Sequence, residues 1–347
     1  MKNELFDALD QLEKEKGISK ETLIDAIEAA LITAYKKNFG SAQNVKIIID
    51  RENGGVKVFS RKEVVEDVEN ELFEISLDDA KKIDPNYEVS DIVEKEVTPR
   101  NFGRIAAQTA KQVVVQRIRE AERTVIYQEF VNRESEIVTG TIQRISKGIV
   151  HINLGRVEAV LLPNEQIQGE AYKQASRLKT YIVEVKKTTK GPQIVVSRTH
   201  PGLVKRLFEL EVPEIHDGVV EIRGISREAG SRTKIAVYSS DENIDPVGAC
   251  VGQRGVRVQN IVDELRGEKI DIIKWDEDPG KFISNSLSPS KVLKVEVAEK
   301  DKSALVVVPD YQLSLAIGKE GQNARLAAKL TGWKIDIKSE SQYEGSL

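Results

Sequence analysis

Two short glycine runs with the same spacing are the residues of this chain best suited to binding a ligand. Gly252-Gln253-Arg254-Gly255 and Gly318-Lys319-Glu320-Gly321 each hold one cation between two glycines. Glycine has no Cβ, so a phosphodiester backbone can lie directly against such a turn. Where a helix follows the turn, its unpaired N–H groups and positive dipole end attract phosphate. The chemistry predicted for these residues is phosphate binding, with no bond made or broken.

An internal repeat places both glycine runs in the same frame. The glycines recur at an offset of 66 residues, and a Lys-Ile-Asp-Ile strand that follows each run, at 269–272 and 334–337, recurs at 65. A lone Gly-x-x-Gly is more often a helix-capping turn, but two copies in matching frames predict helix, strand, strand, helix, glycine run, helix and strand. That order is typical of KH modules, which hold about four nucleotides of a single strand. Glu320 is also compatible with a purely solvent-facing position, because an acid beside phosphate is unfavourable.

Between residues 137 and 197 the hydrophobic period changes to two, and five short strands are separated by turns. This rhythm predicts a small OB-type barrel, a fold that binds single strands on one strand face and its loops. Aromatic residues make up only 5% of the chain, which favours backbone tracking over base stacking. A structural role for its one well-placed ring, His151, stays equally open. The candidate RNA-contacting residues of the barrel are Arg144, Lys147, His151, Lys186 and Arg198.

The first 132 residues predict a separate α/β unit. Two helices are expected over 5–12 and 19–38, then a hairpin around Asn53-Gly54, a helix starting at Ser76, a strand at 92–97 and a long helix at 104–132. Four cations stand on these helices: Lys36, Lys37, Arg104 and Lys111. From the residues alone they are interpreted as solvated or helix-terminal charges.

Composition excludes several classes of protein. Hydrophobic residues at 40% and charged residues at 31% are typical of a soluble globular chain without a membrane span. The acidic, amphipathic start is unlike a signal peptide. A single cysteine, Cys250, fits a reducing cytosol, and three scattered histidines argue against a metal site. No nucleotide-binding or hydrolase motif occurs, so we expect neither a cofactor nor an enzyme.

The formal charge of −4 is unevenly distributed. Residues 1–100 carry 15 basic and 23 acidic residues, a net charge of −8, whereas residues 101–347 carry 37 and 33, a net charge of +4. Such asymmetry indicates different partners for the two parts. A net charge of +4 is too small to indicate a nucleic-acid binder by itself.

The repeated motifs resemble those of the NusA family of bacterial transcription elongation and termination factors. Residues 245–265 and 313–333 are similar to its two KH modules, Ser197-Arg-Thr-His-Pro201 to its barrel-to-KH junction, and 108–123 to its linking helix. The resemblance implies a multidomain α+β fold. The expected domains are an α/β polymerase-binding domain with a long helix at 1–132, an OB-fold barrel of the ribosomal S-one type at 133–200, and tandem prokaryotic-type (type II) KH domains at 201–276 and 277–347.

The same resemblance implies a function. Such proteins bind RNA polymerase near the RNA exit channel and hold the nascent single-stranded RNA, enhancing hairpin-dependent pausing and modulating intrinsic termination and antitermination with other Nus factors. It implies RNA contacts for both glycine runs and for Arg257, Gln322, Asn323 and Arg325, and a polymerase- or hairpin-facing position for Lys36, Lys37, Arg104 and Lys111. A cytoplasmic monomer without membrane contact is expected. Some members carry acidic repeats after the second KH module; since the chain stops at Leu347, we do not expect such repeats here.

One alternative stays open, because KH and OB modules also occur in ribosome-associated and RNA-processing factors. Co-purification with polymerase rather than with ribosomes would separate the two readings.

Overall fold

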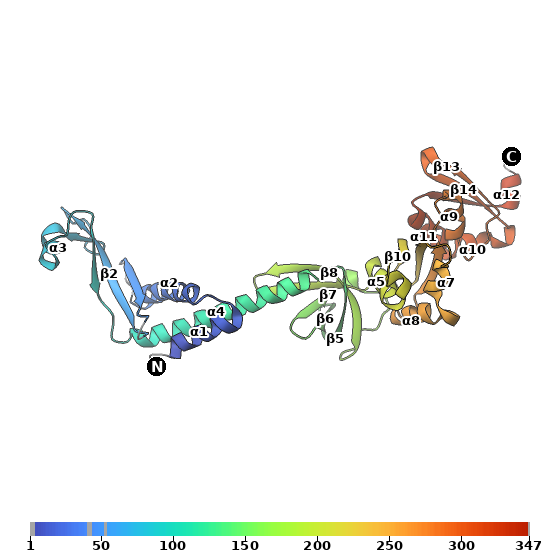
Figure 1. Ribbon diagram of the computed structural model, residues 1–347. Helices are drawn as coiled ribbons and strands as arrows, with labels where there is room; N and C mark the ends of the chain where they lie inside the picture. The colour runs from blue at the N-terminus through green and yellow to red at the C-terminus, as the bar shows by residue number, and fades with distance from the viewer. Residues whose placement is uncertain (1–3, 40–43, 52–53, 346–347) are drawn as a thin grey trace. The chain divides into compact units, whose positions relative to one another are not determined.

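The computed structural model describes residues 4–39, 44–51 and 54–345 (Figure 1). Asn53, the first residue of the expected Asn53-Gly54 turn, lies outside them. The chain divides into two compact units, Met1–Val125 and Ile126–Leu347, and the division falls within helix α4 (Phe102–Val131). None of the described helices is long and apolar enough to cross a membrane.

The first unit combines helices with a four-stranded sheet. Its elements before α4 are α1 (Glu4–Lys16), α2 (Lys20–Phe39), β1 (Val45–Ile49), β2 (Val56–Val65), β3 (Glu74–Ser76), α3 (Leu77–Ile83) and β4 (Ile92–Glu96). Strand β2 is central: β1 and β4 pair with it antiparallel and β3 parallel. Ser76 caps α3 by accepting a hydrogen bond from the Asp79 N–H, which confirms the predicted helix start. The short strand β3 was not anticipated.

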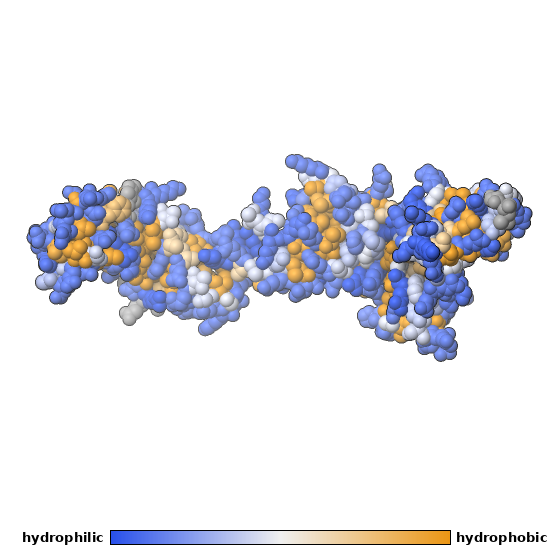
Figure 2. Space-filling view, turned by 90° about the horizontal axis from the view of Figure 1, so that it is seen from above, coloured by the Kyte–Doolittle hydropathy of each residue, from blue (hydrophilic) through white to orange (hydrophobic). Residues whose placement is uncertain are grey.

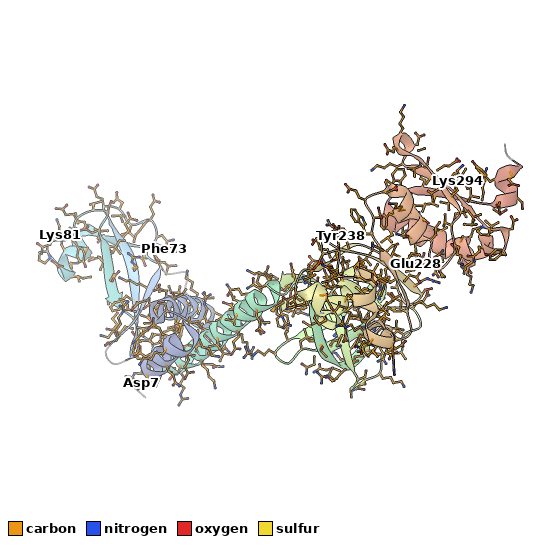
Figure 3. The ribbon with its side chains drawn as sticks, turned by 45° about the vertical axis from the view of Figure 1, so that its right-hand side comes forward. Asp7, Phe73, Lys81, Glu228, Tyr238 and Lys294 are labelled. Carbon is orange, nitrogen blue, oxygen red and sulfur yellow. The ribbon has the colours of Figure 1, made fainter. Side chains whose placement is uncertain are left out.

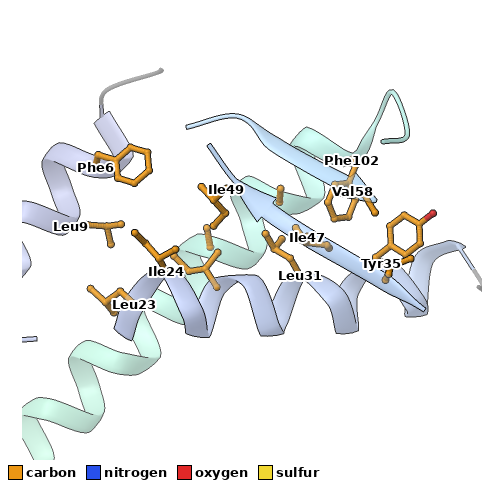
Figure 4. Packing of buried hydrophobic residues seen from close by; sticks show 14 residues of the cluster. Phe6, Leu9, Leu23, Ile24, Leu31, Tyr35, Ile47, Ile49, Val58 and Phe102 are labelled. Atoms are coloured by element: carbon orange, nitrogen blue, oxygen red, sulfur yellow. The ribbon is translucent and has the colours of Figure 1, made fainter. Parts of the chain in front are cut away.

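An apolar stripe of α2 forms the centre of this unit's core. Leu23, Ile27 and Leu31 are buried in one apolar cluster with Ile47 of β1 and Phe102 of α4. Their spacing of four residues puts the three α2 side chains on one helix face. Figure 4 shows Leu23, Leu31, Ile47 and Phe102 in this core. Each such burial contributes roughly 1.5–3 kcal/mol. On the face shown in Figure 2, hydrophilic residues cover most of the surface, with smaller hydrophobic areas among them.

The expected barrel is present and closed. Its strands are β5 (Ile137–Ser146), β6 (Ile149–Asn153), β7 (Glu158–Leu161), β8 (Arg177–Thr188) and β9 (Gly191–Ser197), in the order β5-β6-β7-β9-β8. Only β7 and β9 run parallel, which is the strand order of an OB fold. Closure leaves no free edge, and alternate residues such as Ile152 and Val196 fill the interior.

Two modules of the same architecture follow the barrel. The first, here KH1, contains α5 (Pro201–Glu211), α6 (Pro213–His216), β10 (Val220–Glu228), β11 (Arg232–Ser239), α7 (Pro246–Val251), α8 (Val256–Glu264) and β12 (Lys269–Lys274). The second, KH2, contains α9 (Pro279–Ser286), β13 (Lys294–Ala298), β14 (Ser303–Val308), α10 (Leu313–Ile317), α11 (Gln322–Thr331), β15 (Lys334–Ser339) and α12 (Glu340–Glu344). In each sheet the first two strands are antiparallel and the last two parallel. This confirms the predicted order of elements.

Arg198 joins the barrel to KH1. Its fully buried guanidinium donates to both carboxylate oxygens of Glu170, at 2.6 and 3.2 Å, and to the backbone carbonyls of Lys179 at 3.0 Å and Glu264 at 2.9 Å. Glu170 is also buried, at 4% side-chain exposure. The expectation that Arg198 contacts RNA is therefore wrong, because its donors are taken up inside the protein.

A second buried ion pair continues the same connection. Arg227 donates to both carboxylate oxygens of Glu268 at 2.9 Å and to the His200 carbonyl at 2.8 Å, where α5 begins. Burial alone would raise the pKa of Glu268 and is the largest single effect, yet hydrogen bonds from Arg227 and Thr233 bring that pKa below its ordinary value. The carboxylate thus stays charged and holds KH1 to the segment that leaves the barrel.

KH1 and KH2 are joined by polar and apolar contacts. Glu228, labelled in Figure 3, lies at the end of β10. It accepts hydrogen bonds from Arg325 at 2.7 Å and Gln322 at 2.8 Å, both on α11 of KH2. The bond from Arg325 lowers the pKa of Glu228. The Lys234 ammonium reaches the Ser288 carbonyl at 2.8 Å. Beside these bonds, Ala236 and Ile273 of KH1 share an apolar cluster with Phe282 and Leu330 of KH2.

Replacing Arg198 by alanine should lower the free energy of unfolding of the barrel–KH1 part by about 3–5 kcal/mol, because Glu170 is left in a buried site without its cationic partner. Urea unfolding followed by circular dichroism measures it. The control is Arg177→Ala, which removes an exposed arginine of β8. Equal, small shifts for the two variants would contradict the assignment.

Candidate nucleic-acid interface

The glycine run of KH1 is a tight turn between α7 and α8. Gly252 has φ 72° and ψ 175°, Arg254 has φ 52° and Gly255 has φ 76°. A Cβ on Gly252 would lie 2.7 Å from the Arg257 side chain, so glycine is required there. The turn leaves Gln253 and Arg254 exposed, and no described residue pairs with Arg254.

The run of KH2 repeats this geometry. Gly318 has φ 77° and ψ 172°, Glu320 has φ 54° and Gly321 has φ 73°. A Cβ on Gly318 would lie 2.8 Å from the backbone nitrogen of Asn323, which again leaves room only for glycine. Lys319 and Glu320 are exposed. At the left-handed position the two turns carry opposite charges, Arg254 in KH1 and Glu320 in KH2.

Both turns end on an open helix N-terminus. Gly255 and Gly321 are the N-caps of α8 and α11, and neither position supplies a side-chain hydrogen bond to the helix. The first N–H of each helix donates within the turn, from Val256 to the Gln253 carbonyl and from Gln322 to the Lys319 carbonyl, and no side chain caps the N–H groups that follow. The helix dipole adds positive potential at the same place. An exposed cation stands beside each, Arg254 in one and Lys319 in the other. Phosphate is the ligand that this combination fits.

Two of the expected contact residues hold the turns from inside. Asn323 is buried and its amide donates to the carbonyls of Ala316 and Leu287 at 3.0 Å, so the expectation of an RNA contact is wrong for this residue. Arg257 is partly buried and donates to Glu214 at 2.9 Å and to the Ala249 carbonyl at 2.6 Å. Each side chain lies five residues after the first glycine of its run and packs against it.

Gln322 and Arg325 start α11 beside the second turn. They lie close to the glycine run, as expected, but their donors also bind Glu228 of KH1, and Gln322 reaches Ser231 at 2.8 Å. Arg325 additionally donates to the Glu320 carbonyl at 3.1 Å, which braces the turn. The two residues thus position the KH2 turn relative to KH1.

On the barrel, two of the candidate residues contact a carboxylate that was not predicted from the sequence. Glu158, on β7, accepts from Arg144 at 3.0 Å and lies 2.7 Å from Nδ1 of His151. Lys147 is exposed in the turn after β5, while Lys186 pairs with Glu184 at 2.9 Å. The alternation of β7 places Glu158 on the same outer face as His151, and this pattern could have indicated the pairing.

The four cations of the first unit are all exposed. Lys36 and Lys37 lie in the last turn of α2, and Arg104 and Lys111 lie seven residues apart on α4. None of them has a hydrogen-bond or ion-pair partner among the described residues. An apolar hollow of about 710 Å³ between α1, α2, β1 and α4 borders Lys111.

Other chemistry finds little support in the described part of the chain. No group of three or more His, Cys, Asp or Glu side chains there could hold a metal ion. Cys250 is fully buried, and burial raises the pKa of its thiol to about 12, so it behaves as a small apolar side chain.

An OB barrel joined to two KH modules, each with a glycine turn between two helices, defines a multidomain RNA-binding protein. Family models agree: the NusA N-terminal domain matches residues 4–124, the NusA-like first KH domain 198–275 and the NusA-like second KH domain 279–345. The chain belongs to the NusA family.

Relatives cover nearly its whole length. The transcription termination/antitermination protein NusA of Halalkalibacterium halodurans is 64% identical over 99% of this chain and 90% of that protein. The protein of the same name from Bacillus subtilis is 63% identical over 98% and 92%. The solution structure of the N-terminal domain of NusA from B. subtilis is 63% identical and covers 35% of this chain and 99% of that one, with a TM-score of 0.33.

The Glu158→Gln variant should bind single-stranded RNA a few times more tightly and with a steeper salt dependence, because Arg144 and His151 lose their competing anion. Fluorescence anisotropy across a salt series measures both effects. The Asp78→Asn variant removes the same charge from the first unit and is the control. Unchanged affinity for Glu158→Gln would place the RNA away from this strand face.

Proposed function

We propose that this protein is a transcription termination and antitermination factor that holds the nascent single-stranded transcript while docked on RNA polymerase. It works by binding and not by catalysis. The observation that carries the proposal is the pair of matching glycine turns, each leading into a helix N-terminus that has no side-chain cap and lies beside an exposed cation. The family to which the chain belongs favours this function over that of a ribosome-associated or RNA-processing factor.

The second unit is proposed to be the transcript-binding part. Barrel residues 133–200 and the KH modules at 201–276 and 277–347 would form one RNA surface, because the Arg198 and Glu228 contacts fix their spacing. The residues proposed to touch RNA are Gly252, Gln253, Arg254, Gly255, Gly318, Lys319, Gly321 and, on the barrel, Lys147, with Arg144, His151 and Lys186 where the RNA displaces their acidic partners.

Residues 1–132 are proposed to bind the polymerase. Their net acidity through residue 100 suits a basic surface, and the exposed Lys36, Lys37, Arg104 and Lys111 suit an emerging RNA hairpin. Contacts with other Nus factors in antitermination complexes, and a monomeric state in the cytoplasm, belong to the same proposal.

Reversing the charge in either turn, by Arg254→Glu or Lys319→Glu, should weaken RNA binding about three- to tenfold and lower the salt slope by about one, because a phosphate contact is lost. Polymerase binding should stay intact. Fluorescence anisotropy with single-stranded RNA, and co-purification with polymerase, measure the two. Lys300→Glu makes the same charge change on an exposed KH2 residue away from the turn. A similar loss in that control would argue for non-specific charge effects only.

Single-round transcription at a hairpin-stabilised pause, with cognate polymerase, tests the whole function. The protein should lengthen the pause, and Arg104→Ala or Lys111→Ala should reduce that lengthening, since each removes a cation facing the hairpin. Arg119→Ala, an exposed arginine elsewhere on α4, is the control. No effect of the unaltered protein, with RNA binding intact, would favour the ribosome-associated function instead.

A further inference from the structure

An exposed aromatic ring stands just before the KH2 glycine turn. Tyr311, in the 3-10 turn Asp310–Gln312, is 80% exposed, and Leu315, four residues later in α10, is 46% exposed. Lys319 follows after four more residues. A spacing of four places the ring and the leucine along one face of this helical segment. The segment ends at Gly318, which has φ 77° and ψ 172°, and Lys319 belongs to the turn that follows.

The backbone that carries this ring is fixed on both sides. Asp310 accepts hydrogen bonds from the Ser341 N–H at 3.3 Å and from its hydroxyl at 2.5 Å. The Gln312 side chain accepts from the Lys291 N–H at 2.8 Å. Tyr311 itself has no hydrogen-bond or ring partner among the described residues. A rigid base under a free aromatic ring lowers the entropy lost when a flat ligand stacks on it.

KH1 offers the internal comparison. At the offset of 66 residues its counterparts of Tyr311 and Leu315 are Asp245 and Ala249. The Asp245 carboxylate caps α7 by accepting from the N–H groups of Val247 and Gly248. KH1 therefore has the same turn as KH2 but carries a capping carboxylate and an alanine at the positions of the ring and the leucine.

We propose that KH2 stacks one RNA base on Tyr311, beside Leu315, while the Lys319 turn holds a phosphate of the same strand. The proposal rests on the proposed RNA-binding function and assigns one base-stacking position to KH2. A nucleobase fits this surface because its π-face covers an aromatic ring and its phosphate reaches the adjoining helix N-terminus, a pairing that a protein side chain does not provide.

The test uses the full chain and a short single-stranded RNA in which each nucleotide in turn is made abasic. Tyr311→Ala should weaken binding of the unmodified RNA on the order of tenfold. For one abasic position, the unaltered protein should bind the RNA as weakly as Tyr311→Ala binds the unmodified RNA. With that abasic RNA, Tyr311→Ala should cause no further loss of affinity. Tyr311→Phe keeps the ring and should stay within about twofold of the unaltered protein. Phe73→Ala, an exposed ring of the first unit, is the control.

The outcomes separate this inference from the function beneath it. If Tyr311→Ala binds as tightly as the unaltered protein, or if its loss is the same for every abasic RNA, base stacking on Tyr311 is overturned and RNA binding by the turns stands. If the unaltered protein binds no single-stranded RNA at all, the proposed function itself fails.

Discussion

The fixed spacing of the RNA-binding surfaces depends on the buried guanidinium of Arg198. It meets Glu170 from the barrel and the Glu264 carbonyl from the end of α8, so the barrel and KH1 share one set of hydrogen bonds. A buried ion pair of this kind adds little net stability, since desolvation offsets much of the attraction, but its geometry admits one arrangement. We infer that its contribution is orientation: it sets where the strand faces of the barrel lie relative to the KH1 turn.

The KH1–KH2 contact extends this constraint to the second turn. Gln322 and Arg325 occupy the first two turns of α11, the helix whose N-terminus faces the glycine run, and both are bound by Glu228. The direction in which this helix end points is therefore set by KH1 as well as by its own module. A substitution at Glu228 would therefore shift the proposed phosphate-binding turn of KH2, although Glu228 does not contact the glycine run itself.

The glycine turns and the order of strands could be predicted from the sequence because they follow from local rules. Positive φ values at Gly252 and Gly318 and period-two strands leave marks within a few residues. The roles of Arg198 and Asn323 could not be predicted in this way, because their partners are distant in the sequence. The partners of Arg198 include residues 28 and 66 positions away, and those of Asn323 include Leu287, 36 positions away. Arginine and asparagine at such positions look alike whether they face a nucleic acid or a buried carbonyl.

The net charge of the chain is a poor indicator of RNA binding for the same reason. Many cations of the second unit already have acidic partners, as Arg144 has Glu158 and Lys186 has Glu184. The small net positive charge of this unit therefore does not show where its unpaired cations lie. Among the cations that have no acidic partner in the described part of the chain are Arg254 and Lys319, each next to a helix N-terminus without a side-chain cap. Single subsites of this type bind weakly. Held at fixed distances they act on one strand together, and each contact raises the effective concentration of the next without any new attractive force. The fixed spacing of these subsites thus provides the RNA affinity that a large basic patch provides in other proteins.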